Sequence, residues 1–288
     1  MSRKFDGPRL IVFGGTGYIG RALVAAAPDC LPIGGTLARS AVGLRDCLRG
    51  VAPDAVVVHA AGSVAHAGEP PDPRAYVDST RLLFEAIASS GASARVLTLG
   101  SVAERLPGTG AYACVKREQR AVAQEASDRF GIPWRHLHVH NVIGPDLPAT
   151  LAPGAIVRRL RQVIAAGGHT LPVINGAAER DYLDVRDVAA IVVAVGERFD
   201  VLDRRQPLEI CSGIGRSIHA MAAALVAASG MPIKIMDSPD SVDQSRVVGD
   251  PAPLRAVLGP TAGATIDFGV SIADLWESSA RFPLRASS

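Results

Sequence analysis

Short apolar runs alternate with longer amphipathic stretches over the first half of the chain. The apolar runs predict strands at Leu10–Phe13, Leu31–Leu37, Ala55–His59, Arg95–Leu99 and Trp134–His140. The amphipathic stretches predict helices at Tyr18–Ala27, Arg74–Ser89 and Ala111–Arg129. An uninterrupted run such as AVVVH at 55–59 is typical of a strand that is buried on both faces. The alternation therefore predicts an α/β fold, a doubly wound parallel sheet of the Rossmann type with helices on both faces.

The pattern changes after Asn141, where proline and glycine break the chain into short pieces as far as Gly176. Further helices are predicted at Val185–Phe199, Ser217–Ser229, Pro251–Leu258 and Val270–Glu277. We expect residues 1–142 to form a dinucleotide-binding domain that is rejoined by about 182–205. Residues 143–288 should form mainly a smaller C-terminal lobe that binds the substrate at the carboxyl edge of the sheet.

Composition and charge exclude several kinds of partner. The chain has 288 residues and a formal net charge of +2 at pH 7, so neither nucleic acid nor a membrane is an expected partner. Its four cysteines form no CxxC pair, which favours a reduced, cytoplasmic setting. The start of the chain lacks the apolar core of a signal peptide, and no apolar stretch approaches the ~18 residues of a membrane span. We expect a small-molecule substrate, and a homodimer is one possible assembly.

A glycine pattern follows the first predicted strand and opens the first predicted helix. Gly14, Gly17 and Gly20 have the spacing GxxGxxG. The first glycine permits a tight turn, and the second lets a pyrophosphate approach the backbone. The third packs the helix on the strand, and the N-terminus of that helix offers its N–H groups to the anion. The predicted cofactor contacts in this turn are Gly14, Thr16, Gly17, Tyr18, Ile19 and Gly20.

The residues at the end of the second predicted strand indicate whether such an enzyme binds NAD or NADP. NAD enzymes place an acidic residue there for the ribose 2′-hydroxyl, whereas NADP enzymes offer an arginine to the 2′-phosphate. No acidic residue lies between Cys30 and Leu44, but Arg39 does. The sequence therefore predicts that NADPH is preferred over NAD, with Arg39 contacting the phosphate. The alternative is that Arg39 is an ordinary solvated side chain in a chain with 27 arginines and three lysines.

Three residues are candidates for catalysis. Tyr112 and Lys116 lie four residues apart in a predicted helix, so their side chains share one face. With four tyrosines and three lysines, such a pair would arise by chance in roughly one of 25 such chains. A chain so rich in arginine keeps lysine here, where a compact ammonium lowers the pKa of a phenol. Ser101 ends the fourth predicted strand and should face the same cleft.

The glycine turn with Ser101, Tyr112 and Lys116 resembles the short-chain dehydrogenase/reductase superfamily. Four more segments resemble its extended branch, the nucleotide-sugar epimerases, dehydratases and reductases: HAAG at 59–62, HNVIGP at 140–145, RDYLDV at 180–185 and CSGIGRS at 211–217. The resemblance covers most of the chain. It implies an NAD(P)-dependent oxidoreductase in which Tyr112 is the general acid or base, Lys116 holds the nicotinamide ribose and Ser101 polarises the carbonyl.

The resemblance also implies binding roles. The cofactor would lie beside Ala60, Ala61 and Gly62. The substrate would contact Ser101, His140 and Asn141, and a diphosphate would bind the planar guanidinium of Arg180. Three features depart from the branch. The loop between Ser101 and Tyr112 is short, and the predicted helix Arg74–Ser89 lacks the usual asparagine. The usual second substrate arginine is replaced by DSPDSVDQSR at 237–246, which leaves Arg246 as a substitute.

His136, His138 and His140 alternate along a predicted strand and should share one face. Three such side chains span roughly 13 Å, too far for one ion, so no metal is expected.

Three functions remain open at this point. The first is NADPH-dependent reduction of a keto group on a nucleotide-linked deoxysugar, with epimerisation as a close variant. The second is reduction of a non-sugar ketone of secondary metabolism. The third is an NADP-sensing protein without turnover, although such relatives typically lose the tyrosine or the lysine that this chain keeps as Tyr112 and Lys116.

Overall fold

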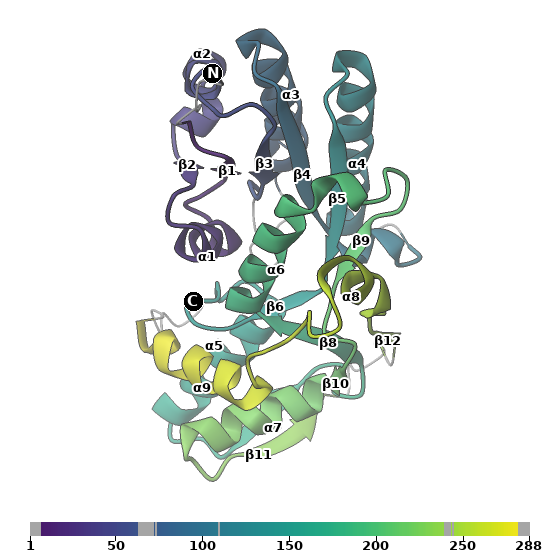
Figure 1. Cartoon of the computed structure of the whole chain (residues 1–288). Helices are drawn as coiled ribbons and strands as arrows, with labels where there is room; N and C mark the ends of the chain where they lie inside the picture. Colours follow the sequence, from purple (N-terminus) through teal and green to yellow (C-terminus); the bar gives the residue numbers. More distant parts are fainter. Residues whose placement is uncertain are drawn as a thin grey trace. The chain divides into compact units, whose positions relative to one another are not determined.

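The computed structural model describes residues 7–62, 72, 74–108, 110–238, 243 and 245–281. It divides into two compact units, each made of several segments (Figure 1). The first unit holds the chain as far as Val139 together with Val188–Ile210 and Ala252–Ala262. The second holds His140–Asp187, Cys211–Pro251 and the chain from Gly263 on. The sequence predicted that the dinucleotide-binding domain ends at residue 142 and is rejoined by about 182–205. It did not predict that the segment Ala252–Ala262 also belongs to the first unit.

The first unit is built on one parallel sheet. Its strands are β1 (Leu10–Phe13), β2 (Leu31–Ile33), β3 (Ala55–His59), β4 (Ala94–Ser101), β5 (Trp134–Val139) and β9 (Leu208–Ile210). They lie in the order β2-β1-β3-β4-β5-β9, and every neighbouring pair is parallel. Every residue of β3 and β5 is buried, as expected for strands covered on both faces.

Helices cover both faces of this sheet, which confirms the predicted doubly wound α/β fold. One face packs in a single apolar cluster with α2 (Ala41–Leu48), α3 (Ser79–Ser90) and α4 (Ala111–Phe130). On the other face, Gly196 near the end of α6 (Val185–Glu197) lies against Val56 and Leu97. The first unit also contains α1 (Tyr18–Ala26), α8 (Ala252–Leu258), the π-turn Arg74–Asp78, and the 3-10 turns Leu37–Arg39, Val102–Arg105 and Phe199–Val201.

The second strand and the helix after it differ from the sequence prediction. The strand ends at Ile33 instead of Leu37, because Gly34 and Gly35 follow and Gly35 adopts a φ of +59°. Helix α2 was not predicted. Its N-terminal signal is Ser40, whose hydroxyl accepts a hydrogen bond from the Gly43 N–H.

The second unit is built around β8 (Glu179–Asp184). Strands β6 (Asn141–Ile143) and β12 (Arg246–Val247) pair with it in parallel, and β10 (Gly215–Ser217) pairs antiparallel. A separate pair joins β7 (Thr170–Val173) and β11 (Lys234–Asp237), and the remaining helical segments are α5 (Ala152–Ala165), α7 (Ile218–Ser229), α9 (Phe268–Ser278) and the turn Ser279–Arg281. The sequence missed α5 because Pro153 and Gly154 suggested a break, but proline is tolerated in the first turn of a helix, where it stands here. Within the described chain, no helix combines the length and the apolar character that crossing a membrane requires.

Candidate active site

The glycine turn between β1 and α1 has the geometry of a phosphate cradle. Gly14 has a φ of +96°, and a Cβ there would lie 2.4 Å from the Ala61 nitrogen. A Cβ on Gly20 would lie 2.0 Å from the Gly14 carbonyl oxygen, so α1 packs directly on the turn. A Cβ on Gly17 would meet only that same oxygen, at 3.3 Å. Gly17 is also the N-cap of α1 and makes no side-chain cap bond, so no side chain of the cap stands between the positive end of the helix dipole and an approaching anion.

A cleft of about 860 Å³ opens beside this turn in the first unit. Its described wall includes Gly14, Thr16, Gly17, Arg39, Ala60, Ala61 and Gly62 from the predicted cofactor contacts. Of the other predicted cofactor contacts, Tyr18, Ile19 and Gly20 form the first turn of α1, and Tyr112 and Lys116 belong to α4. The structure thus brings most of these residues to one cavity, and the cradle with its cleft fits a dinucleotide.

Charged residues from a second segment also reach the cleft, which the sequence did not indicate. Asp78 and Glu85 line it together with Arg81, and Arg81 forms an ion pair with Asp78 at 3.2 Å. The sequence could not predict this grouping, because these residues belong to α3 and the turn before it, far in sequence from Arg39. Arg39 ends the 3-10 turn that follows β2 and lines the same cleft.

The turn after β3 packs on aromatic and hydroxyl side chains. His59 is fully buried, and its Nε2 lies 3.1 Å from the Thr80 hydroxyl. Burial, together with the positive charge of Lys116, lowers the pKa of His59 to about 3, so its ring is neutral. A Cβ on Gly62 would lie 2.3 Å from the Tyr76 ring, which explains why glycine ends the HAAG segment.

Ser101, Tyr112 and Lys116 come from the end of β4 and the first turns of α4. Lys116 is buried, and its Nζ donates to the Leu99 carbonyl oxygen (2.9 Å) and to Gln119 Oε1 (2.8 Å). It also lies 4.5 Å from the centre of the Tyr76 ring. Tyr112 is 39% exposed. The sequence did not single out Gln119 or Tyr76, because neither carries a motif and only packing brings them to the lysine.

The electrostatic surroundings suit proton donation by Tyr112. Burial of its hydroxyl end raises the pKa of Tyr112, and the negative charge of Glu104 adds to this, while the side chain of Ser101 acts in the opposite direction. Burial lowers the pKa of Lys116 to about 8, against the charge of Glu104, which raises it. At neutral pH the tyrosine is therefore protonated and the lysine is mostly an ammonium.

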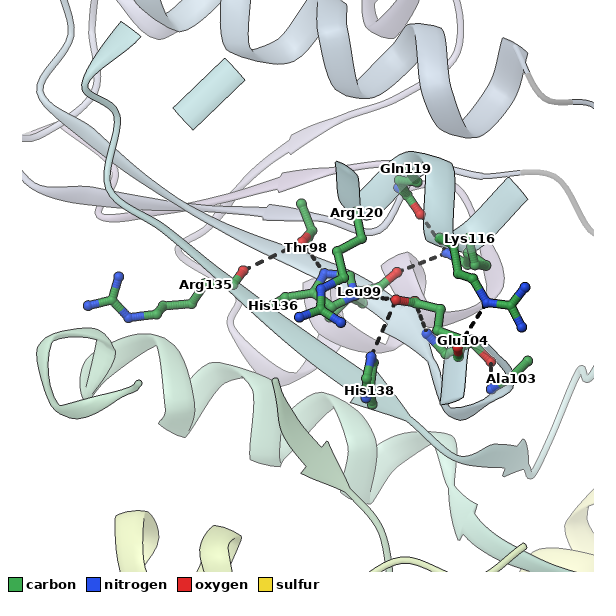
Figure 2. A network of polar contacts seen from close by, with 12 residues as sticks. Thr98, Leu99, Ala103, Glu104, Lys116, Gln119, Arg120, Arg135, His136 and His138 are labelled. Atoms are coloured by element: carbon green, nitrogen blue, oxygen red, sulfur yellow. Dashed lines mark hydrogen bonds and ion pairs between the residues drawn. The ribbon is translucent and has the colours of Figure 1, made fainter. Parts of the chain in front are cut away.

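A buried acid lies beneath Ser101 and was not predicted. Glu104 contacts the Nε2 atoms of His136 and His138, at 3.0 and 3.3 Å, and accepts a hydrogen bond from the Ser101 N–H (Figure 2). The ligand atoms of the three side chains lie within 4.8 Å of one another. The sequence showed two of the histidines on one strand face, but it gave no sign that a glutamate from the turn after β4 meets them.

Three of the four predicted substrate residues, His140, Asn141 and Arg180, lie in the second unit, whereas Ser101 lies in the first. Asn141 begins β6 and donates to the Asp181 carbonyl oxygen at 3.2 Å. His140 precedes it and is buried, with its Nε2 only 2.8 Å from where a Cβ on Gly249 would be. Arg180 on β8 donates to the Ser245 carbonyl oxygen and forms an ion pair with Asp243 at 2.6 Å.

A second arginine accompanies Arg180. Arg216 on β10 is its direct partner in the antiparallel pair, so both side chains lie on one face. Arg246 pairs instead with Glu179, the neighbour of Arg180 on the strand, and therefore lies on the opposite face, where it forms an ion pair with Glu179 at 2.9 Å. Strand pairing thus makes Arg216, and not Arg246, the arginine that shares a surface with Arg180.

The parallel sheet, the glycine cradle and the Ser101–Tyr112–Lys116 set together define an NAD(P)-dependent enzyme of the short-chain dehydrogenase/reductase kind. The model of the NAD dependent epimerase/dehydratase family matches residues 35–211. The chain belongs to this family. Comparison with curated protein sequences gave no match.

Several solved structures have the same fold. RMD from Pseudomonas aeruginosa complexed with NADPH has a TM-score of 0.78 at 21% identity, covering 94% of this chain and 98% of that one. UDP-glucuronic acid 4-epimerase from Bacillus cereus in complex with UDP-glucuronic acid and NAD has a TM-score of 0.76 at 14% identity, covering 95% and 99%. A GDP-L-fucose synthetase from Naegleria fowleri has a TM-score of 0.76 at 17% identity, covering 98% and 96%. The resemblance to the extended branch is therefore confirmed, and at these identities the likeness concerns the fold.

Proposed function

We propose that this enzyme uses NADPH to reduce a keto group on a nucleotide-linked deoxysugar. The observation that carries the proposal is the pairing of a protonated Tyr112 with a buried, charged Lys116 in the unit that holds the cofactor cleft. Such a pair supplies a proton to a carbonyl oxygen and stabilises the phenolate left behind.

NADPH, when bound, would supply the hydride that the carbonyl carbon receives. The Ser101 hydroxyl would donate a hydrogen bond to the carbonyl oxygen, where negative charge develops. The Tyr112 hydroxyl would transfer its proton to that oxygen, which completes the alcohol. Lys116 would stabilise the resulting phenolate by its charge, held in place through the Leu99 carbonyl and Gln119.

The cofactor choice rests on the cleft. The pyrophosphate would lie on the backbone at Gly14 and Gly17 and at the start of α1. Arg39, which lines the cleft, would contact the 2′-phosphate, and the segment from β2 to Leu44 has no acidic residue to bind a free 2′-hydroxyl. RMD, which shares the fold, was solved with NADPH, while the Bacillus cereus epimerase was solved with NAD, so cofactor identity needs a direct test.

The substrate class rests on the second unit. Arg180 and Arg216 present two guanidinium groups on one sheet face, which suits a diphosphate. Asp243 already pairs with Arg180, so a diphosphate would have to replace that carboxylate. A non-sugar ketone is the alternative that this ion pair favours, because such a substrate makes no demand on Arg180.

The second candidate function is epimerisation, which the family and the NAD-bound structure of the Bacillus cereus epimerase favour. The amount of cofactor consumed distinguishes a reductase from an epimerase. A reductase exchanges its cofactor at every turnover, whereas an epimerase keeps NAD through a full cycle. We expect the purified protein to carry little bound cofactor and to consume one NADPH for each keto group reduced in a panel of nucleotide-linked 4-keto sugars. Tightly held NAD⁺ with redox-neutral conversion of one nucleotide sugar into another would establish the epimerase instead.

A further inference from the structure

Glu104 is a buried acid with an unusual set of donors. Its side chain is 2% exposed. It accepts hydrogen bonds from the Ser101 N–H at 2.8 Å and from the Nε2 atoms of His136 and His138 at 3.0 and 3.3 Å. Burial acts to raise the pKa of Glu104, but the bonds from the two histidines and from Ser101 outweigh it and bring the pKa to about 2. The side chain is therefore a carboxylate at any pH at which the enzyme works.

A chain of hydrogen bonds fixes where the proton of His136 sits. Trp134 Nε1, which can only donate, bonds to Thr98 Oγ1 at 2.9 Å. The hydroxyl of Thr98 has two acceptors within reach, His136 Nδ1 at 2.6 Å and the Arg135 carbonyl oxygen at 3.5 Å, and the much shorter contact directs its proton to His136. Burial also lowers the pKa of His136, so the ring is neutral and carries its one proton on Nε2, facing Glu104.

This arrangement favours an anchored anion over a metal site. A metal ion would need the lone pair of His136 Nε2, which in the bonded chain carries the proton. The packing agrees, because a Cβ on Gly100 would lie 2.2 Å from His136 Nε2 and 2.3 Å from Glu104 Oε1. Glycine at position 100 therefore allows Glu104 and His136 to approach each other against the strand.

The turn that carries Glu104 is held from both sides. On one side, the histidines of β5 hold the carboxylate (Figure 2), and the carboxylate in turn holds the Ser101 backbone. Beside it, Arg117 of α4 donates to the carbonyl oxygens of Glu104 (3.0 Å) and Leu106 (2.7 Å). The turn is thus fixed between the strand that ends at Ser101 and the helix that carries Tyr112 and Lys116.

We propose that Glu104 is a positioning residue, anchored by His136 and His138, that sets the Ser101 turn and holds a fixed negative charge beside Tyr112 and Lys116. The inference rests on the proposed function, because it takes Tyr112 and Lys116 to carry the reaction. Charged or titratable groups that face Glu104 or its histidines come from β5 (His136 and His138), from β9 (Glu209, the direct strand partner of His138) and from α4 (Tyr112, Lys116, Arg117 and Arg120).

The kinetic test is Glu104→Gln, which keeps the shape and removes the charge. We expect kcat to fall by about tenfold or more while the Kd of NADPH changes by less than about twofold. Because the charge of Glu104 raises the pKa of Lys116 and of Tyr112, the decline of kcat at alkaline pH should also move to lower pH. Glu118→Gln, an exposed position on α4, is the matched control and should change neither quantity. An unchanged kcat and pH profile in Glu104→Gln, or an equal loss of NADPH binding, would overturn the proposal.

Conservative substitution separates anchoring from packing. In His136→Gln the amide nitrogen can still donate to Glu104, so kcat should stay within about threefold of the wild type. In His136→Met the volume is similar but the donor is gone, so kcat should fall by about as much as in Glu104→Gln. Equal losses in both variants would show that the position matters only for packing.

A spectroscopic measurement tests the anchor without any substrate. Nitrogen NMR of the ¹⁵N-histidine-labelled protein, assigned by comparison with His136→Gln, should show His136 neutral with its proton on Nε2 between pH 6 and pH 8. Added Zn²⁺ should leave the signals of His136 and His138 unchanged. A proton on Nδ1, or loss of the Nε2 protons on addition of Zn²⁺, would overturn the anchor. A protein with this tautomer that reduces no keto sugar would instead contradict only the proposed function.

Discussion

The two units build their polar sites in different ways. In the first unit, the two hydrogen-bond acceptors of the catalytic lysine, Leu99 and Gln119, lie within 21 residues of each other in sequence. In the second, Arg180 binds Asp243 and Ser245, which lie 63 and 65 residues further along the chain. Lys116 is also buried, whereas Arg180 is only half-buried and Arg246 is exposed. The chemistry is thus encoded locally, and the surface that would recognise a substrate is assembled by distant strand pairing.

This difference has an energetic counterpart. Solvent screens charges poorly in the buried network around Lys116 and Glu104, so one altered group there changes the pKa values of its neighbours. An ion pair such as Arg180–Asp243, partly open to water, contributes less and exchanges partners more easily. Substitutions should therefore affect kcat in the first unit and KM in the second.

The largest effect is expected for Tyr112→Phe, which removes the proton donor and keeps the ring. General acid catalysis typically contributes about 10²–10⁴-fold, so kcat should fall by that order. NADPH affinity should hold, because the lost hydroxyl anchors no part of the cofactor in the proposed mechanism. Measured by steady-state kinetics and NADPH titration, a variant that keeps more than about a tenth of wild-type kcat would contradict the assignment of the acid.

Arg180→Ala should act on the substrate alone. We expect KM for a nucleotide-diphosphate sugar to rise by about tenfold or more, with NADPH binding unchanged, because a charge-assisted bidentate contact is lost. Arg246→Ala, on the opposite face of the same sheet, is the control and should leave KM near wild type. Asp243→Asn should lower KM, since it removes the carboxylate that competes for Arg180. Equal KM in all four proteins would favour the non-sugar ketone.

Arg39→Ala tests the cofactor contact. The wild type should bind NADPH about tenfold more tightly than NADH, and the variant should lose most of that difference. Arg45→Ala, on α2 and paired with Asp46, is the control. Side-by-side titrations that show equal affinity of the wild type for the two cofactors would contradict the prediction.

The smallest effect is a pH dependence. The pKa of Lys116 is lowered to about 8, so the ammonium is present below that pH and lost as the pH rises through it. We expect kcat to decline by a few-fold above about pH 8, because a neutral amine no longer stabilises the phenolate. In Lys116→Arg, whose side chain does not titrate in this range, the decline should disappear at a lower overall kcat. A flat wild-type profile up to pH 10 would show that the lysine charge does not limit turnover.

The sequence by itself determined the doubly wound fold, the extended branch and the set of catalytic candidates. Each depends on a pattern within a short stretch: the strand of AVVVH, the glycine turn at 14–20 and the helical spacing of Tyr112 and Lys116. Local patterns survive folding because a turn or a helix face is fixed by residues a few positions apart.

Only the tertiary structure decided the surroundings of these candidates. Glu104 meets His136 and His138 because β4 and β5 are neighbours in the sheet, which no spacing along the chain shows. Likewise, Arg216 faces Arg180 because β10 pairs with β8, while Arg246, the arginine that the sequence offered, lies on the other face. Strand order and register place side chains from distant segments together, and a shift of one residue would move each to the opposite face.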